Sequence, residues 1–70
     1  MIYIAFTRKP GEIAEIHTLH EGQIETRFNN GLSFTNIVHR DEVPRMIQDQ
    51  VNKLHDLGYV QTGENNGQND

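Results

Sequence analysis

The chain lacks cysteine and tryptophan altogether and has only 2 prolines among its 70 residues. Without cysteine there is no disulfide and no thiolate ligand, which excludes zinc ribbons and thiol catalysis. No stretch approaches the roughly 20 apolar residues that cross a bilayer, and residues 1–20 lack the basic start and apolar core of a signal peptide. We therefore expect a cytoplasmic protein that does not use a membrane.

Basic side chains are also scarce, with 6 Lys and Arg against 10 Asp and Glu, for a net charge of −4. This balance argues against a general binder of phosphate backbones, although a local basic patch stays open. A chain this short buries only about 60% of the surface that its unfolded form exposes. We expect a thin core of one sheet face under one helix, with little room for a cleft of about 300 Å³.

Alternating apolar and polar residues predict four antiparallel strands over residues 1–7, 12–19, 23–28 and 32–38. Turns are predicted at Pro10-Gly11 and at Gly22, and Asn30-Gly31 favours a type I′ hairpin. The second strand is the least defined, because Ile13 and Ile16 have opposite parity and cannot both face the core without a bulge. Its register stays open.

The period changes after His39, where Asp41 suits a helix N-cap. One stripe of a single amphipathic helix is then predicted from Val43, Ile47, Val51, Leu54 and Leu57, with Met46 beside it. Gly58 fits the left-handed residue that ends a helix. The predicted fold is α+β: a four-stranded meander and a C-terminal helix on one face form a single domain over residues 1–61, followed by a disordered polar tail over residues 62–70.

Parity divides the predicted sheet into two faces. The face under the helix is predicted to carry Ile2, Ile4, Phe6, Ile24, Thr26, Phe28, Leu32, Phe34 and Val38. The open face is predicted to carry Tyr3, Ala5, Glu25, Arg27, Ser33, Thr35, Ile37 and His39. Because arginine and tyrosine often anchor interfaces, we predict partner binding by Tyr3, Arg27, Thr35, Ile37 and His39.

Catalytic and cofactor chemistry finds little support in the sequence. Ser33 is the only serine and has no nucleophile-elbow pattern around it, and the Asp41-Glu42 pair suits a helix start. The four histidines, His17, His20, His39 and His55, lack the spacing of a metal motif. We therefore expect no enzyme activity, no cofactor and no metal site.

The remaining hypothesis is a small non-enzymatic regulator, inhibitor or adaptor that binds another protein, with a homodimer as one form. Its size and acidity resemble those of accessory proteins from phages and mobile elements. The alternative is binding of single-stranded nucleic acid through the sheet with Arg8, Lys9 and Arg27. The order of four strands and a helix over residues 1–60 resembles a single PUR repeat. Proteins of that family bind single-stranded nucleic acids and dimerise. The resemblance lies in the order of elements alone and implies no site residues.

Overall fold

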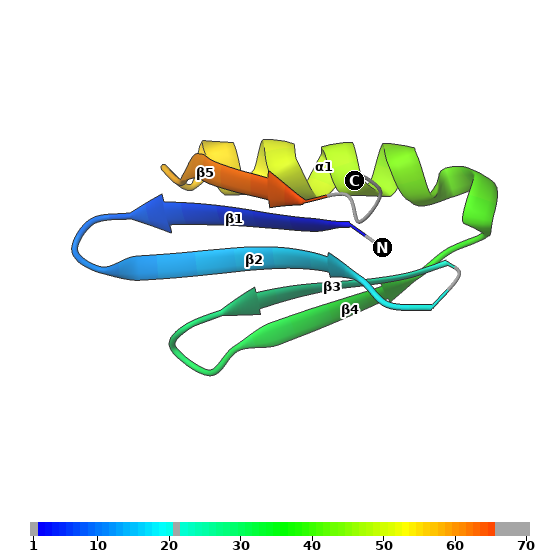
Figure 1. The fold of residues 1–70 in the computed structure, drawn as a ribbon, viewed down its shortest axis with the longest axis horizontal. Helices are drawn as coiled ribbons and strands as arrows, with labels where there is room; N and C mark the ends of the chain where they lie inside the picture. Colours follow the sequence, from blue (N-terminus) through cyan, green and yellow to red (C-terminus); the bar gives the residue numbers. More distant parts are fainter. Residues whose placement is uncertain (1, 21, 66–70) are drawn as a thin grey trace.

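A computed structural model describes residues 2–20 and 22–65 of the chain. One antiparallel sheet with strand order β4-β3-β2-β1-β5 carries one α-helix on one face (Figure 1). The elements are β1 (Tyr3–Arg8), β2 (Glu12–Thr18), β3 (Gln23–Phe28), β4 (Ser33–Ile37), the 3₁₀ helix η1 (Arg40–Glu42), α1 (Val43–Asp56) and β5 (Val60–Asn65). The predicted α+β class with one helix is confirmed, but the sheet has five strands instead of four.

The fifth strand follows the helix and pairs antiparallel with β1, from Thr7 opposite Val60 to Tyr3 opposite Asn65. Residues 62–65 were expected in the disordered tail, and that expectation is wrong for them. Their sequence is polar because the strand is held mainly by its backbone ladder with β1, which needs no apolar alternation. The register shifts between Ala5 and Phe6, which marks a bulge. The rest of the predicted tail, residues 66–70, lies outside the described residues.

The core consists of apolar side chains from β1, β2, β3 and the helix, closed by one aromatic ring after the helix. Its buried members are Ile4, Phe6, Ala14, Ile16, Ile24, Ile47, Leu54 and Tyr59, and buried Thr26 lies on the same face. The open question about β2 is resolved without a bulge, since Ile4 pairs with Ile16 and Thr7 with Ile13. Ile16 therefore faces the helix, and Ile13 lies on the opposite face, where it is exposed.

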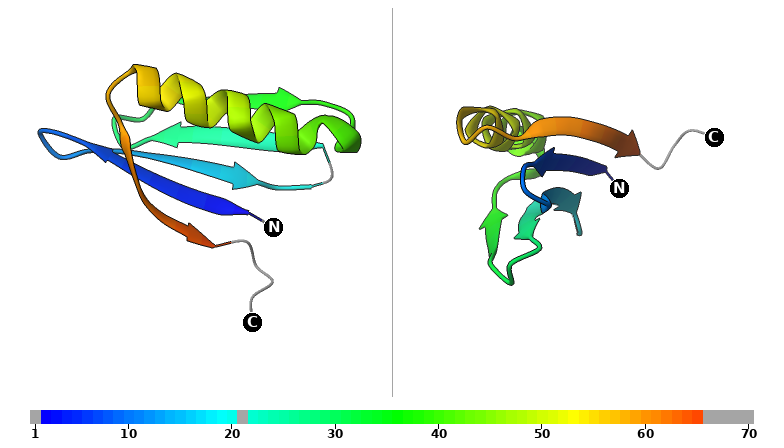
Figure 2. Two further views of the ribbon diagram at one scale, coloured as in Figure 1. Left: turned by 90° about the horizontal axis from the view of Figure 1, so that it is seen from above. Right: turned by 90° about the vertical axis from the view of Figure 1, so that its left-hand side faces the viewer.

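The helix lies along one face of the twisted sheet and contacts β2 and β3 (Figure 2), whereas no residue of β4 is buried. Leu32 and Phe34, which parity placed in the core, are each 55% exposed, and Leu57 of the predicted helix stripe is 54% exposed. Width explains these corrections: a helix is about 10 Å across, whereas strands are spaced about 4.8 Å apart. One helix therefore covers about two strands, and the twist of the sheet carries β4 away from it.

The two ends of the helix differ in how they are capped. The predicted N-cap Asp41 is wrong: it lies inside η1, where the His39 imidazole accepts a hydrogen bond from the Asp41 backbone N–H, and the N-cap of α1 is Glu42, whose side chain makes no capping bond. At the other end Gly58 has a φ of +96°, as predicted for a helix terminator. The N–H of Gly58 bonds the His55 carbonyl and that of Tyr59 bonds the Leu54 carbonyl, both at 2.9 Å. This Schellman pattern directs the Tyr59 ring back onto the core.

The hairpin between β3 and β4 forms where it was predicted, but its turn is of another type. Only Gly31 has a positive φ there, because no described residue other than glycine adopts one, so the predicted type I′ turn is wrong. The Phe28 N–H donates to the Leu32 carbonyl, and the Gly31 N–H donates to the Phe28 carbonyl. These bonds close a three-residue loop, residues 29–31, that ends on a left-handed glycine. At the other end of these strands, a β-carbon on Gly22 would collide with the Val38 carbonyl oxygen.

Candidate functional site

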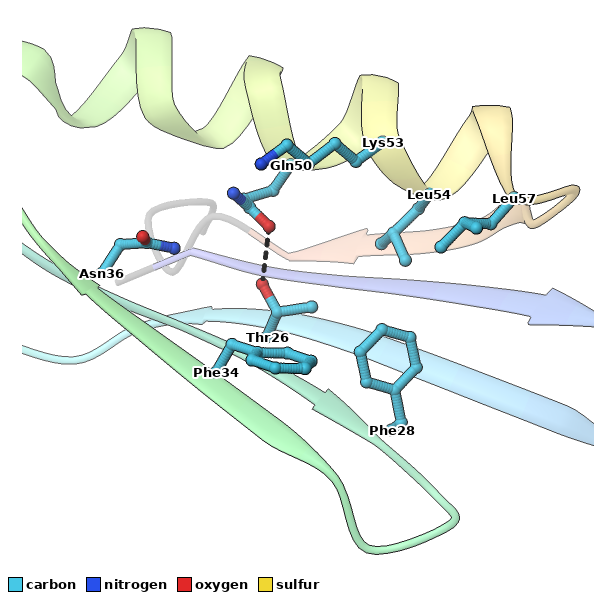
Figure 3. Close-up of a pocket in the computed structure, with 8 residues that line it drawn as sticks. All are labelled: Thr26, Phe28, Phe34, Asn36, Gln50, Lys53, Leu54 and Leu57. Atoms are coloured by element: carbon cyan, nitrogen blue, oxygen red, sulfur yellow. Dashed lines mark hydrogen bonds between the residues drawn. The ribbon is translucent and has the colours of Figure 1, made fainter.

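A groove of about 340 Å³ runs between the helix and the β3–β4 hairpin (Figure 3). Its lining residues are Thr26, Phe28, Phe34, Asn36, Gln50, Lys53, Leu54 and Leu57. The sequence predicted little room for a cleft of about 300 Å³, and the groove between helix and hairpin exceeds that expectation. The groove exists because the sheet is wider than the single helix that covers it.

Apolar side chains from three elements form one end of the groove. Phe28 and Phe34 meet edge to face across β3 and β4, with ring centroids 6.1 Å apart, and Phe28 contacts Tyr59 in the same way at 6.0 Å. Leu54 and Leu57 line the helix side of this end (Figure 3). Aromatic rings that pack against each other lose little further freedom when a ligand covers them, so this wall is preorganised.

The other end of the groove is polar. The Thr26 hydroxyl donates a hydrogen bond of 3.4 Å to the Gln50 side-chain oxygen, which connects β3 to the helix (Figure 3). Asn36 lines the groove from β4 and Lys53 from the helix. Among the described residues, the Lys53 ammonium has no salt-bridge or hydrogen-bond partner. The groove thus combines an apolar wall with one ammonium group that makes no ion pair with the described residues.

A second hollow of about 240 Å³ adjoins the groove and shares Phe28, Phe34 and Leu57 with it. Arg8 lies at its margin: its Nε donates to Glu12 at 2.6 Å, and its guanidinium donates to the Leu57 carbonyl at 2.5 Å. The guanidinium carbon also lies 4.5 Å from the centre of the Tyr59 ring. The hydrogen bond from Arg8 lowers the pKa of Glu12. Arg8 therefore joins the end of the helix to the sheet.

The open face, opposite the helix, carries four of the five residues predicted to bind a partner. Strand pairing aligns Tyr3 with His17, His17 with Glu25, and Glu25 with Thr35. Arg27, opposite Ser33, and Ile37, opposite Gln23, lie on the same face at opposite ends of the β3–β4 pair, and Ile37 is 79% exposed. The fifth predicted residue, His39, lies beyond β4, where it caps η1.

The middle of the open face is a hydrogen-bonded polar network. The Tyr3 hydroxyl donates to Glu15 at 2.9 Å, the His17 imidazole lies 3.0 Å from the other Glu15 oxygen, and Arg27 bonds Glu25 at 2.9 Å. The hydrogen bonds from His17 and then Tyr3 lower the pKa of Glu15, and the bond to Glu15 raises the pKa of Tyr3. Tyr3 and Arg27 are therefore occupied within the chain.

The basic residues of the nucleic-acid alternative do not come together. Arg8 projects on the helix side of the sheet, where it bonds Glu12, whereas Arg27 projects on the open face. Lys9 is exposed in the turn after β1. In residues 2–20 and 22–65, no three His, Asp or Glu side chains gather closely enough to hold a metal ion, and no helix is long and apolar enough to span a membrane.

The groove residues Phe34, Lys53 and Leu57 were not predicted as site residues. Phe34 and Leu57 have the periodicity of core positions, and both side chains do point into the space between the helix and the sheet. Their exposure depends on where the helix lies across the sheet, which periodicity does not report.

Comparisons with known proteins give no relative. The chain matches no family model, and neither the curated proteins nor the solved structures give a significant match. The fold itself departs from the four strands and terminal helix that prompted the likeness to a PUR repeat, since a fifth strand follows the helix.

Proposed function

We propose that this chain is a small non-enzymatic binding protein, a regulator, inhibitor or adaptor, whose protein partner inserts apolar side chains into the groove. One observation carries the proposal: Phe34 and Leu57 line the two sides of the groove with about half of each side chain exposed. Full burial of a leucine or phenylalanine side chain contributes roughly 1.5–3 kcal/mol. Covering the exposed halves of both residues would thus contribute about 2 kcal/mol to binding.

The chemistry of the groove indicates what the partner presents. An aliphatic or aromatic side chain fits between Phe34 and Leu57, and a carboxylate beside it would pair with the Lys53 ammonium. Because the chain carries a net charge of −4, this unpaired lysine is a local exception on an acidic protein. A rim charge of this kind orients a partner and raises its association rate more than its affinity.

The lining of the groove supports binding more than catalysis. Its polar groups are a threonine, two amides and one lysine, which supply no carboxylate or imidazole as a general base. The cluster of Tyr3, Glu15 and His17 holds titratable groups, but it lies on the opposite face of the sheet. Enzyme activity is therefore not part of the proposal.

Two other surfaces are weaker candidates. A partner on the open face would have to displace the hydrogen bonds that Tyr3 and Arg27 already make with Glu15 and Glu25. A nucleic acid would have to bind without a continuous basic patch, since Arg8 and Arg27 project to opposite sides. Its binding would weaken steeply with salt, unlike that of a partner held mainly by apolar contacts.

The test is affinity capture from the source cells with three forms of the chain. The groove variant combines Phe34→Thr with Leu57→Gln, and the control combines Ile13→Thr with Val60→Thr, which are exposed apolar residues of the open face. We expect a protein that the parent and the control retain and the groove variant loses. The purified pair, measured by calorimetry, should then show at least about tenfold weaker binding for the groove variant. Equal binding by the groove variant, or equal loss from the control, would refute the proposal.

A further inference from the structure

The two edges of the sheet differ in a way that bears on self-association. Edge strands expose unpaired backbone groups, and proteins usually protect them with charge, proline or bulges. The β5 edge has a register shift opposite Ala5 and Phe6, and it contains Gly63 and Glu64. The β4 edge pairs with β3 without a register shift, and its sequence SFTNI contains no charge and no proline.

The neutrality of β4 extends beyond the strand. No ionisable side chain occurs between Arg27 and His39, although 23% of all residues in the chain are charged. Leu32, Phe34 and Ile37 are all exposed within this segment. Two copies of an acidic protein repel each other over most of their surface, so a neutral apolar hairpin is where they can approach most closely.

The ladder between β3 and β4 determines which backbone groups face the free edge. Phe28 N–H bonds the Leu32 carbonyl at 2.8 Å, and Val38 N–H bonds the Gly22 carbonyl at 2.7 Å. Because alternate residues of an antiparallel strand point the same way, residues 32, 34, 36 and 38 direct their backbone groups toward β3. The N–H and C=O groups of Ser33, Thr35 and Ile37 therefore point outward, away from β3.

We infer that two copies of this chain pair through antiparallel β4 strands, with Thr35 opposite Thr35 of the second copy on a two-fold axis. This register aligns Ser33 with Ile37 of the other copy, so all three outward residues enter hydrogen-bonded pairs and form about six bonds. A shift by two residues in either direction leaves one of the three outward residues of each β4 without a partner in the other β4. The register is therefore determined by the backbone.

Side chains on both faces suit the same register. On the open face, threonine meets threonine, a favourable cross-strand pair, and Ile37 lies beside the short Ser33. On the helix face, each Phe34 lies opposite Asn36 of the second copy. The two Phe34 residues are then diagonal neighbours about 7–8 Å apart, within reach of aromatic rings. The product is one continuous sheet with both helices on the same side.

This inference does not depend on the proposed function: Phe34 borders both surfaces, but the pairing rests on the outward backbone groups of β4, which the groove does not use. An interface of a single strand pair is smaller than a standard interface of about 1,600 Å², so we expect a weak dimer. Sedimentation of the parent from about 10 μM to 1 mM should show a concentration-dependent dimer. A parent that sediments as a monomer throughout this range would overturn the inference.

Amide hydrogen exchange by NMR tests the register without any substitution. Protection of Ser33, Thr35 and Ile37 should rise with protein concentration, whereas Phe34 and Asn36 should be protected at every concentration by their bonds to β3. Either of the shifted registers would leave Ser33 or Ile37 without concentration-dependent protection. A dimer with that pattern, or with no rise at these three amides, would overturn the inference.

A matched pair of variants tests the edge directly. Thr35→Pro removes an outward N–H and leaves the β3–β4 ladder intact, while Thr35→Val keeps the N–H in a side chain of the same shape. We expect the dimer dissociation constant to rise at least about tenfold for Thr35→Pro and less than about threefold for Thr35→Val. Circular dichroism checks that both fold; if Thr35→Pro unfolds, the exchange pattern decides. A folded Thr35→Pro that dimerises like the parent would overturn the inference, and Leu57→Gln, which alters only the groove, should dimerise normally.

Discussion

Leu54 is the position where the packing of helix on sheet can be tested most directly. It is 2% exposed, lies among the core side chains and accepts the backbone bond that ends the helix. Leu54→Ala removes three carbon atoms, a loss of about 2.4 kcal/mol at roughly 0.8 kcal/mol for each. The cavity adds to this, but Leu54 borders the groove, so part of the vacated space joins the solvent. We expect a cost of about 2.5–3.5 kcal/mol, near the lower end of the range for buried leucines.

Such a cost is large for this chain, because a core of this size supplies about 3–5 kcal/mol in total. Urea unfolding followed by circular dichroism at 222 nm would measure it. With an m-value of roughly 1 kcal/mol/M, the midpoint should fall by about 2.5–3.5 M, which leaves the variant close to unfolding in water. The control is Leu57→Ala, the same change three residues later at a side chain that is 54% exposed.

Leu57→Ala should cost about 1 kcal/mol or less, since only half of that side chain is buried. If the two variants shift the midpoint equally, the helix is not seated on the sheet through Leu54. A Leu54→Ala variant that loses less than about 1 kcal/mol would contradict the assignment of the core in the same way.

Three further predictions concern the turns, the polar network and the last strand. Gly22→Ala should destabilise the fold by at least about 1 kcal/mol more than Gly31→Ala. Both glycines have a positive φ, but only a β-carbon at position 22 would meet a backbone carbonyl, that of Val38. Equal urea midpoints for the two variants would contradict this. Hydrogen bonds from the His17 imidazole and the Tyr3 hydroxyl lower the pKa of Glu15 below its ordinary value of 4.5. The ionised Glu15 carboxylate therefore stabilises the fold above pH 4.5, and this stabilisation is lost as the pH falls through the lowered pKa. Glu15→Gln should therefore lose less stability than the parent on acidification below about pH 4.5, and parallel stability curves would count against the network. A chain that ends at Gln61 should melt below one that ends at Asn65, because it lacks most of the β5 ladder; identical melting points would show that this ladder adds nothing.

The features that the sequence determined are those encoded by neighbouring residues. Alternation over the first and third strands places Ile4, Phe6 and Ile24 on the helix side, because side chains of a strand alternate whatever the strand pairs with. The end of the helix is equally local, since Gly58 tolerates a backbone conformation that other residues rarely adopt. The same alternation places Arg27, Thr35 and Ile37 on one face.

Tertiary structure decided what covers each of these side chains. Phe34 and Leu57 have the spacing of core residues, yet they line a groove, because one helix is too narrow to cover the whole sheet. The open-face network is likewise a result of register, which brings Tyr3 to Glu15 from a different strand. The strand β5 has no apolar alternation, since an edge held by backbone bonds does not need one, and its existence depends on the free side of β1. Periodicity thus determines where a side chain points, whereas its exposure depends on the distant elements that pack against it.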